Sequence, residues 1–193
     1  MTTYYICRHG ETENNKEKRL SGWIDTPLTE AGVKNAINVA AKLKNITIDK
    51  IISSDLGRTF VTAYIISRQI GYESSIDRYK ELREVNYGDL ANLPINDAIA
   101  AYPAGLNIST NVAPNGESLA QMQQRVVNFI EVLSIANSGK TILIVGHDGT
   151  INAVYANYTN QDIGEVDSSR SNNHDLVAKF TVANNKVESF AEQ

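Results

Sequence analysis

Two histidines in this sequence follow short apolar runs, at points where a strand is expected to end. His9 comes after Tyr4–Cys7 with Arg8 directly before it, and His147 comes after the run 141–145. A neutral imidazole can attack phosphorus, and a guanidinium can hold phosphate oxygens by paired hydrogen bonds. Arg8 and His9 therefore have the layout of a phosphate-attacking nucleophile with an anion clamp beside it.

Charged residues at two other strand ends suit the same chemistry. Arg58 falls in the first turn of an expected helix after the strand-like run 49–53, where its guanidinium and the free backbone N–H groups can face an anion. The stretch Glu81–Glu84 follows another strand-like run, 76–79. Because the carboxyl ends of parallel strands meet at one edge of a sheet, we expect these segments to lie beside the two histidines.

The elements that must position these residues alternate in the pattern of an α/β domain. The expected strands are 3–7, 49–53, 76–79 and 141–145, followed by a hairpin of 176–182 and 187–190 around Asn184-Asn185. Helices are expected after Thr29, Asp55 and Pro94, from Ser118, and from Thr150 to about Ala156. This order predicts a three-layer sandwich, with a mostly parallel central sheet, helices on both faces and a small cap or lid segment around residues 85–115.

Apolar residues at helical spacing predict the buried faces of the first two long helices. In the first helix they are Val33, Ala36, Ile37, Ala40 and Leu43, and in the second Leu56, Phe60, Ala63, Ile66 and Ile70. Ser118 and Gln121 form a capping box at the start of a third amphipathic helix.

The composition fits one globular domain over residues 1–193, because 42% of the chain is hydrophobic. A net charge of −4 argues against a dedicated nucleic-acid binder, which would present a basic face. The single cysteine, Cys7, is expected to be a small core residue. The sequence shows neither a signal peptide nor an apolar stretch of membrane-spanning length, so we expect a cytoplasmic protein that does not bind membranes.

Each candidate residue also has a plain structural alternative. A single arginine or glutamate is usually solvated, and His147 taken alone is as readily a residue that begins a helix. No further histidine or carboxylate follows His147-Asp148 at ligand spacing, which argues against a metal site. His174, in a polar stretch, is expected in a surface or capping role. A basic cluster in the loop beside His9 is expected to be a solvated face, and the alternative is that it pairs with an acidic group of the substrate: Lys16, Lys18 and Arg19.

Five segments taken together resemble the histidine phosphatase superfamily, also called the phosphoglycerate mutase-like family. They read YYICRHGETENNKEKRLSGWIDTPLTEAG, IISSDLGRT, ELREVNYGDL, PNGESLAQMQQRV and ILIVGHDGT, and they follow the family's order and spacing over nearly the whole chain. The resemblance implies that His9 is the nucleophile and Glu84 the proton donor. It implies that the phosphoryl group is bound by Arg8, Arg58, His147 and Asn15. It places in the substrate pocket Arg19, Ser21, Gly22 and Tyr87.

These implied roles agree with elementary chemistry. His9 must be neutral at its attacking nitrogen, and we expect its other nitrogen to donate to a backbone carbonyl that fixes the tautomer. The arginines and His147 would stabilise the charge on the in-line phosphoryl oxygens. The reaction then needs neither a metal nor a cofactor, and Glu84 would protonate the leaving oxygen and later activate water.

The resemblance covers both mutases and phosphatases. Cofactor-dependent mutases carry basic residues after the catalytic glutamate, with arginine where this chain has Val85. From Val85 to Gln124 the chain has no lysine or arginine, so a ligand with three or more negative charges would remain largely unpaired. We therefore favour hydrolysis of a phosphomonoester whose leaving group is neutral or partly apolar.

The expected partner is a small phosphorylated metabolite. The alternatives are a cofactor-dependent phosphoglycerate mutase, a phosphohistidine protein phosphatase and a non-catalytic phosphate-binding module. The sequence leaves the physiological substrate unidentified and the choice between monomer and homodimer open.

Overall fold

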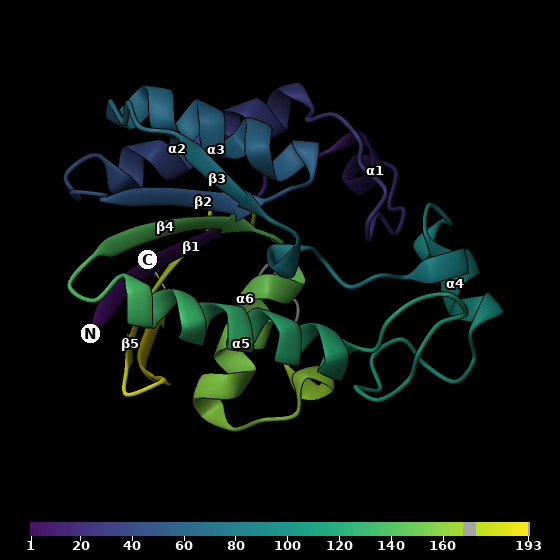
Figure 1. Ribbon diagram of the computed structural model, residues 1–193. Coiled ribbons are helices and arrows are strands. Elements are labelled where there is room, and N and C mark those ends of the chain that lie inside the picture. The colour runs from purple at the N-terminus through teal and green to yellow at the C-terminus, as the bar shows by residue number, and fades with distance from the viewer. Residues whose placement is uncertain (168–172, 193) are drawn as a thin grey trace.

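A six-stranded sheet forms the centre of the computed structural model, which describes residues 1–167 and 173–192 (Figure 1). In the order in which they lie side by side, its strands are β3 (Ile76–Tyr79), β2 (Lys50–Ser54), β4 (Thr141–Gly146), β1 (Thr2–Arg8), β5 (Val177–Ala183) and β6 (Lys186–Glu192). The first four run parallel, whereas β5 and β6 are antiparallel to their neighbours. The sheet is therefore mostly parallel, as predicted, and mixed at one edge.

Two pairs of helices cover the two faces of the sheet (Figure 1). α2 (Glu30–Leu43) and α3 (Gly57–Ile70) lie on one face, and α5 (Leu119–Ala136) and α6 (Asp148–Thr159) lie on the other. Successive side chains of β1 point to opposite faces, so Tyr5 and Cys7 join the core under α2 and α3 while Tyr4 and Ile6 join the core under α5 and α6. The predicted α/β sandwich is confirmed. Among the helices of the described residues, none is both long and apolar enough to cross a membrane.

The buried face of α2 differs from the prediction at two positions. Val33 and Ile37 are 39% and 41% exposed. The helix instead packs through a narrower stripe, formed by Gly32, Ala36, Val39, Ala40 and Leu43. Val33 and Ile37 each follow a member of this stripe by one residue, which is about 100° around a helix and turns them toward solvent.

The starts of two helices also differ from the prediction. α3 begins at Gly57 with Leu56 as its N-cap, so the expectation that Asp55 caps it is wrong. Asp55 instead forms an ion pair of 2.6 Å with Arg83. α6 begins directly after its N-cap His147, two residues before the predicted start. His147 therefore lies at the junction between β4 and a helix.

Three local predictions are confirmed. Asn184 and Asn185 have φ angles of 51° and 59°, and they join β5 to β6 as the two left-handed residues of a tight hairpin turn. Ser118 and Gln121 form the expected capping box of α5. A short helix, α4 (Ile95–Ala101), follows Pro94.

The cap segment, residues 85–115, lies beyond the carboxyl ends of the parallel strands (Figure 1). It contains α4 and has a small core of its own, in which Leu90, Ala98 and Ala113 are buried. A backbone bridge between Arg19 and Pro94 joins it to the loop that follows β1 and contains α1 (Glu13–Lys16). Two segments distant in sequence thereby enclose the same edge of the sheet.

Candidate active site

His9 lies just past the end of β1 and is only 4% exposed. Its Nδ1 lies 2.8 Å from the carbonyl oxygen of Gly10, and its Nε2 lies 3.2 Å from Nε of Arg58. A carbonyl only accepts and a guanidinium only donates, so Nδ1 carries the proton and Nε2 keeps its lone pair. Burial, then the charges of Arg58 and Arg8, lower the pKa of His9 well below its ordinary value. His9 is thus a neutral imidazole in the tautomer that a nucleophile requires.

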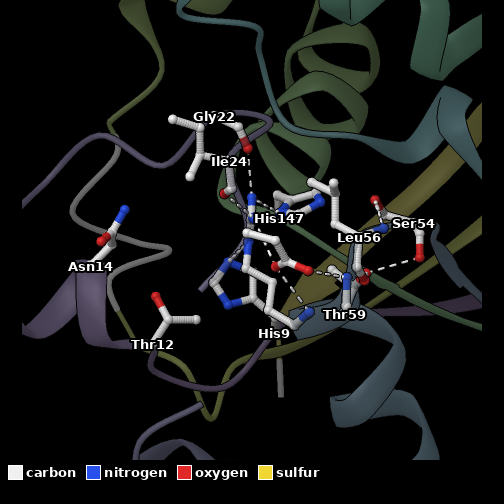
Figure 2. A network of polar contacts seen from close by, with 12 residues as sticks. His9, Thr12, Asn14, Gly22, Ile24, Ser54, Leu56, Thr59 and His147 are labelled. Carbon is white, nitrogen blue, oxygen red and sulfur yellow. Dashed lines mark hydrogen bonds and ion pairs between the residues drawn. The ribbon is translucent and has the colours of Figure 1, made fainter. Parts of the chain in front are cut away.

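Arg58 lies in the first turn of α3 and is 2% exposed. Its guanidinium donates to the carbonyl oxygens of Gly22 and Ile24, at 2.7 and 2.8 Å. Figure 2 shows Gly22 and Ile24 in the same polar network as the two imidazoles. The guanidinium also points donors to His9, to His147 and to the Asp25 carboxylate. The loop after β1 therefore fixes this cation over the attacking nitrogen.

His147 completes this group from the end of β4, and its ring centroid lies 5.3 Å from that of His9. Nη2 of Arg58 lies 3.3 Å from its Nδ1, which must therefore accept, leaving the proton on Nε2. That Nε2 is buried and has no hydrogen-bond partner among the described residues. Burial and the charge of Arg58 lower the pKa of His147 well below its ordinary value. A buried N–H donor beside the nucleophile suits a phosphoryl oxygen. His9, Arg58 and His147 are called the phosphate end below.

The N-terminus of α3 does not offer its amides to an anion as predicted. Asp25 accepts hydrogen bonds from the backbone N–H groups of Gly57 and Arg58, and it also pairs with the Arg58 guanidinium at 3.3 Å. A carboxylate from the loop after β1 thus takes the place that the sequence suggested for phosphate oxygens. Asp25 instead orients Arg58.

Glu84 lies at the same edge of the sheet, in the segment that follows β3. Its two carboxylate oxygens accept from the backbone N–H groups of Val85 at 2.8 Å and Gly149 at 3.1 Å. A Cβ atom at Gly149 would overlap Oε1 of Glu84, so this glycine makes room for the carboxylate. Glu84 is therefore held beside the first turn of α6, close to His147.

Two side chains that the sequence did not point to, Trp23 and Arg125, hold the backbone around Glu84 in place by hydrogen bonds. Nε1 of Trp23 donates to the Glu84 carbonyl at 2.8 Å. Arg125 of α5 donates to the carbonyls of Glu81 and Arg83, at 2.9 and 3.0 Å. These contacts link residues up to 61 positions apart in sequence, so no local pattern announces them.

Three other residues near His9 in the sequence lie in different surroundings. Arg8 at the end of β1 lies near enough to lower the pKa of His9 and of His147. Asn15 uses its side-chain oxygen to cap α1, accepting from the N–H and hydroxyl of Thr12; its predicted role toward phosphate stays a prediction. Gly10 is required by packing, because a Cβ there would overlap the backbone of Gly32 in α2.

The structure separates the residues that the resemblance placed in a substrate pocket. Tyr87 lines the cavity described below. Gly22 and Ser21 lie in the loop that holds Arg58, and Ser21 lines no part of that cavity. Arg19 turns to Glu17 and to the carbonyl of Asn92, at 2.9 and 2.7 Å, and so fastens the loop to the cap segment. The two lysines of the basic cluster are exposed, as expected: Lys16 and Lys18.

The expectation of a surface or capping role for His174 is wrong. This half-buried side chain lies 2.8 Å from the carbonyl oxygen of His9, and its ring centroid is 5.9 Å from that of His9. Its Nδ1 must donate in this contact, because a carbonyl only accepts. The polar stretch before β5 gave no sign of this, since the antiparallel pairing of β5 with β1 is what returns the chain to His9.

A cavity of about 470 Å³ lies beside Glu84 and extends under the cap segment. We call it the cap cavity. Its apolar walls include Ile95, Ile99, Leu106 and Ile108 from the cap, with Leu119 and Met122 from α5. Its polar lining includes Glu84, Tyr87, Asp148 and Asn152. The sequence marked the apolar cap residues but gave no role to Asp148 or Asn152.

Comparisons with known proteins agree with this architecture. The family model of the histidine phosphatase superfamily (branch 1) matches residues 4–189. The chain belongs to this superfamily. A curated relative from Escherichia coli (strain K12 / DH10B), named "Probable phosphoglycerate mutase GpmB", is 36% identical over 152 residues, covering 76% of this chain and 70% of the relative.

Solved structures show the same fold. YhfR of Bacillus stearothermophilus superposes with a TM-score of 0.84 at 25% identity, covering 97% of this chain and 95% of that one. The alpha-ribazole phosphatase of Shigella flexneri superposes with a TM-score of 0.81 at 25% identity, covering 96% of this chain and 93% of that one. The relatives thus include proteins named as a mutase and as a phosphatase.

Proposed function

We propose that this chain hydrolyses phosphate monoesters, without a metal, through a phosphohistidine formed on His9. The observation that carries the proposal is the fixed tautomer of His9, whose Nδ1 is held by the Gly10 carbonyl while its Nε2 lone pair faces Arg58. A nucleophile in a positively charged, buried setting suits phosphoryl transfer, where positioning and electrostatic stabilisation dominate.

In the first step, Nε2 of His9 attacks phosphorus and the bond to the ester oxygen breaks. Glu84, in its protonated form, gives its proton to the departing oxygen. Arg58 exchanges its hydrogen bond with His9 for bonds to the phosphoryl oxygens, and His147 contributes the N–H that lacks a partner among the described residues. Arg8 adds positive charge at the end of β1.

In the second step, the Glu84 carboxylate takes a proton from water, and the water oxygen attacks phosphorus. The bond between phosphorus and Nε2 breaks, inorganic phosphate leaves, and Glu84 is protonated again. His9 returns to the neutral tautomer that its environment favours, because burial and the nearby arginines oppose a second proton on the ring. The free enzyme is then ready for another ester.

The cap cavity favours hydrolysis over mutation. Among the described residues, its lining contains neither lysine nor arginine, so a second phosphate or a carboxylate on the ligand would find no cation there. The name of the E. coli relative points instead toward phosphoglycerate mutation. A test must therefore compare ester hydrolysis with phosphoglycerate interconversion.

The test is turnover of p-nitrophenyl phosphate with and without EDTA, by the wild type and by His9→Ala. We expect activity that persists in EDTA, is blocked by vanadate and is lost in the variant. A panel of esters follows, containing 3-phosphoglycerate, 2,3-bisphosphoglycerate, α-ribazole 5′-phosphate and a phosphohistidine protein. Faster interconversion of phosphoglycerates than release of phosphate would overturn the proposal, as would activity that requires a metal. A preferred phosphoprotein would assign the protein-phosphatase alternative, and phosphate binding without turnover would assign a binding module.

A further inference from the structure

One side of the cap cavity is formed by two polar residues of α6. Asp148 directly follows His147, and Asn152 lies one helical turn later on the same face. Nδ2 of Asn152 donates to Oδ1 of Asp148 at 3.2 Å, which orients the carboxylate. Both residues line the cavity beside Glu84. The proposed chemistry assigns no task to either of them.

The electrostatics of this cavity are one-sided. Its acidic lining residues are Asp148 and Glu84, and within the part of the chain that the structure describes no lysine or arginine lines it. Arg8 is the cation whose charge acts on Asp148, and the two acids repel each other. The Oδ1 atom of Asn152 is buried and has no hydrogen-bond partner among the described residues. A buried acceptor without a donor is costly, and so is a buried carboxylate with no cation in contact with it.

We propose that Asp148 and Asn152 recognise the leaving group, and that preferred substrates are phosphate monoesters whose alcohol carries an ammonium group on an apolar body. The inference rests on the proposed function, because it names the substrate class of the same site. The ammonium would pair with Asp148 and give a hydrogen bond to Asn152. The apolar body would pack against Ile99, Leu106 and Ile108 of the cap.

The same arrangement disfavours anionic leaving groups. A carboxylate placed in the cap cavity would face Asp148 at low local dielectric, where like charges repel strongly. The size of the cavity, about 470 Å³, falls within the range of small-molecule sites. Selectivity would then arise from attraction to a cation together with rejection of an acid.

Three esters that differ only at one end would test this inference. They are 4-(aminomethyl)phenyl phosphate, 4-ethylphenyl phosphate and 4-(carboxymethyl)phenyl phosphate, compared by kcat/KM at a pH where Asp148 is ionised. We expect the wild type to prefer the ammonium ester over the ethyl ester by about tenfold, and to disfavour the carboxylate by a similar factor. In Asp148→Asn both ratios should approach one. In Asn152→Leu the ammonium preference should fall by about threefold, because the carboxylate loses its orienting bond.

Asp97→Asn is the matched control, since it removes one negative charge from exposed α4 without touching the cavity, and its ratios should equal those of the wild type. Inhibition by vanadate should stay within about twofold in all variants if the phosphate end is intact. An equal loss on all three esters in Asp148→Asn, with unchanged ratios, would assign Asp148 to proton transfer and overturn the inference. Turnover with no ammonium preference would also overturn it while leaving the proposed function standing. No turnover of any ester by the wild type would remove both.

Discussion

The phosphate end and the cap cavity adjoin each other but are built in opposite ways. His9, Arg58 and His147 lie where β1, β2 and β4 lead into the following loop or helix, and backbone carbonyls fix the polar atoms of His9 and Arg58. The cap cavity is walled mainly by α4, loops and the start of α6, and its charges are negative. A rigid, positive end suits a phosphoryl group common to all substrates. A loop-built, negative end can vary in specificity without disturbing that chemistry.

Arg58→Ala tests the rigid end and should have the largest effect. The guanidinium contacts both histidines and two carbonyls, and no other described side chain makes this set of contacts. We expect kcat/KM for p-nitrophenyl phosphate to fall by about 10³-fold, since a preorganised donor is lost at the reacting charge. Arg58→Lys should recover little, because a lysine cannot reproduce the planar fork. Arg68→Ala, exposed on the same helix, is the control, and a loss under tenfold in Arg58→Ala would contradict the assignment.

Gly149→Ala tests the boundary between the two regions. The new methyl group would overlap the Glu84 carboxylate and crowd Met122, so the carboxylate must move. We expect kcat for phenyl phosphate to fall by about 10²-fold, which is the contribution of a positioned acid.

The choice of ester serves as the control for this variant. p-Nitrophenolate leaves without needing a proton, so kcat/KM for its ester, which reports the first step alone, should fall much less than kcat/KM for phenyl phosphate. An equal loss on the two esters would show that the substitution damages the phosphate end rather than the acid. Gly149 would then support the phosphate end rather than only the Glu84 carboxylate.

The sequence predicted the phosphate end far better than the cap cavity, and the reason is physical. His9, Arg58 and His147 each sit beside a strand whose apolar run is readable locally, so their meeting follows from the parallel sheet. Asp25 and His174 reach the same place through long-range contacts that leave no local pattern. The surface exposure of Val33 and Ile37 in α2 likewise depends on how α2 packs against α3.

The pH dependence of the free energy of unfolding tests whether Asp148 puts an unfavourable negative charge in the cap cavity. Burial, then repulsion from Glu84, raise the pKa of Asp148 to about 7, while Arg8 and the Asn152 hydrogen bond oppose the shift. A native pKa above the unfolded one means that ionised Asp148 destabilises the native state. This cost grows as the pH rises from about 4 to about 7 and is then constant.

We expect Asp148→Asn to raise the free energy of unfolding by about 1–3 kcal/mol at about pH 8, and by less at about pH 5. Urea unfolding at both pH values measures the difference, with Asp97→Asn as the control. A variant that loses stability at about pH 8 would show that Asp148 is well paired in the free protein. The cap cavity would then carry less unfavourable negative charge than its contrast with the phosphate end requires.

His174→Ala should have the smallest effect, because this residue acts on the nucleophile only through its backbone. The imidazole donates to the His9 carbonyl at 2.8 Å but does not touch the attacking Nε2. We expect kcat to fall by about three- to tenfold with little change in KM, since one orienting hydrogen bond is worth about 1 kcal/mol. His174→Asn, which keeps a short N–H donor, should recover part of the loss, whereas a merely structural role would be filled as well by His174→Leu. A drop in kcat as deep as that of Arg58→Ala would instead place His174 within the phosphate end and extend its rigid construction to the turn before β5.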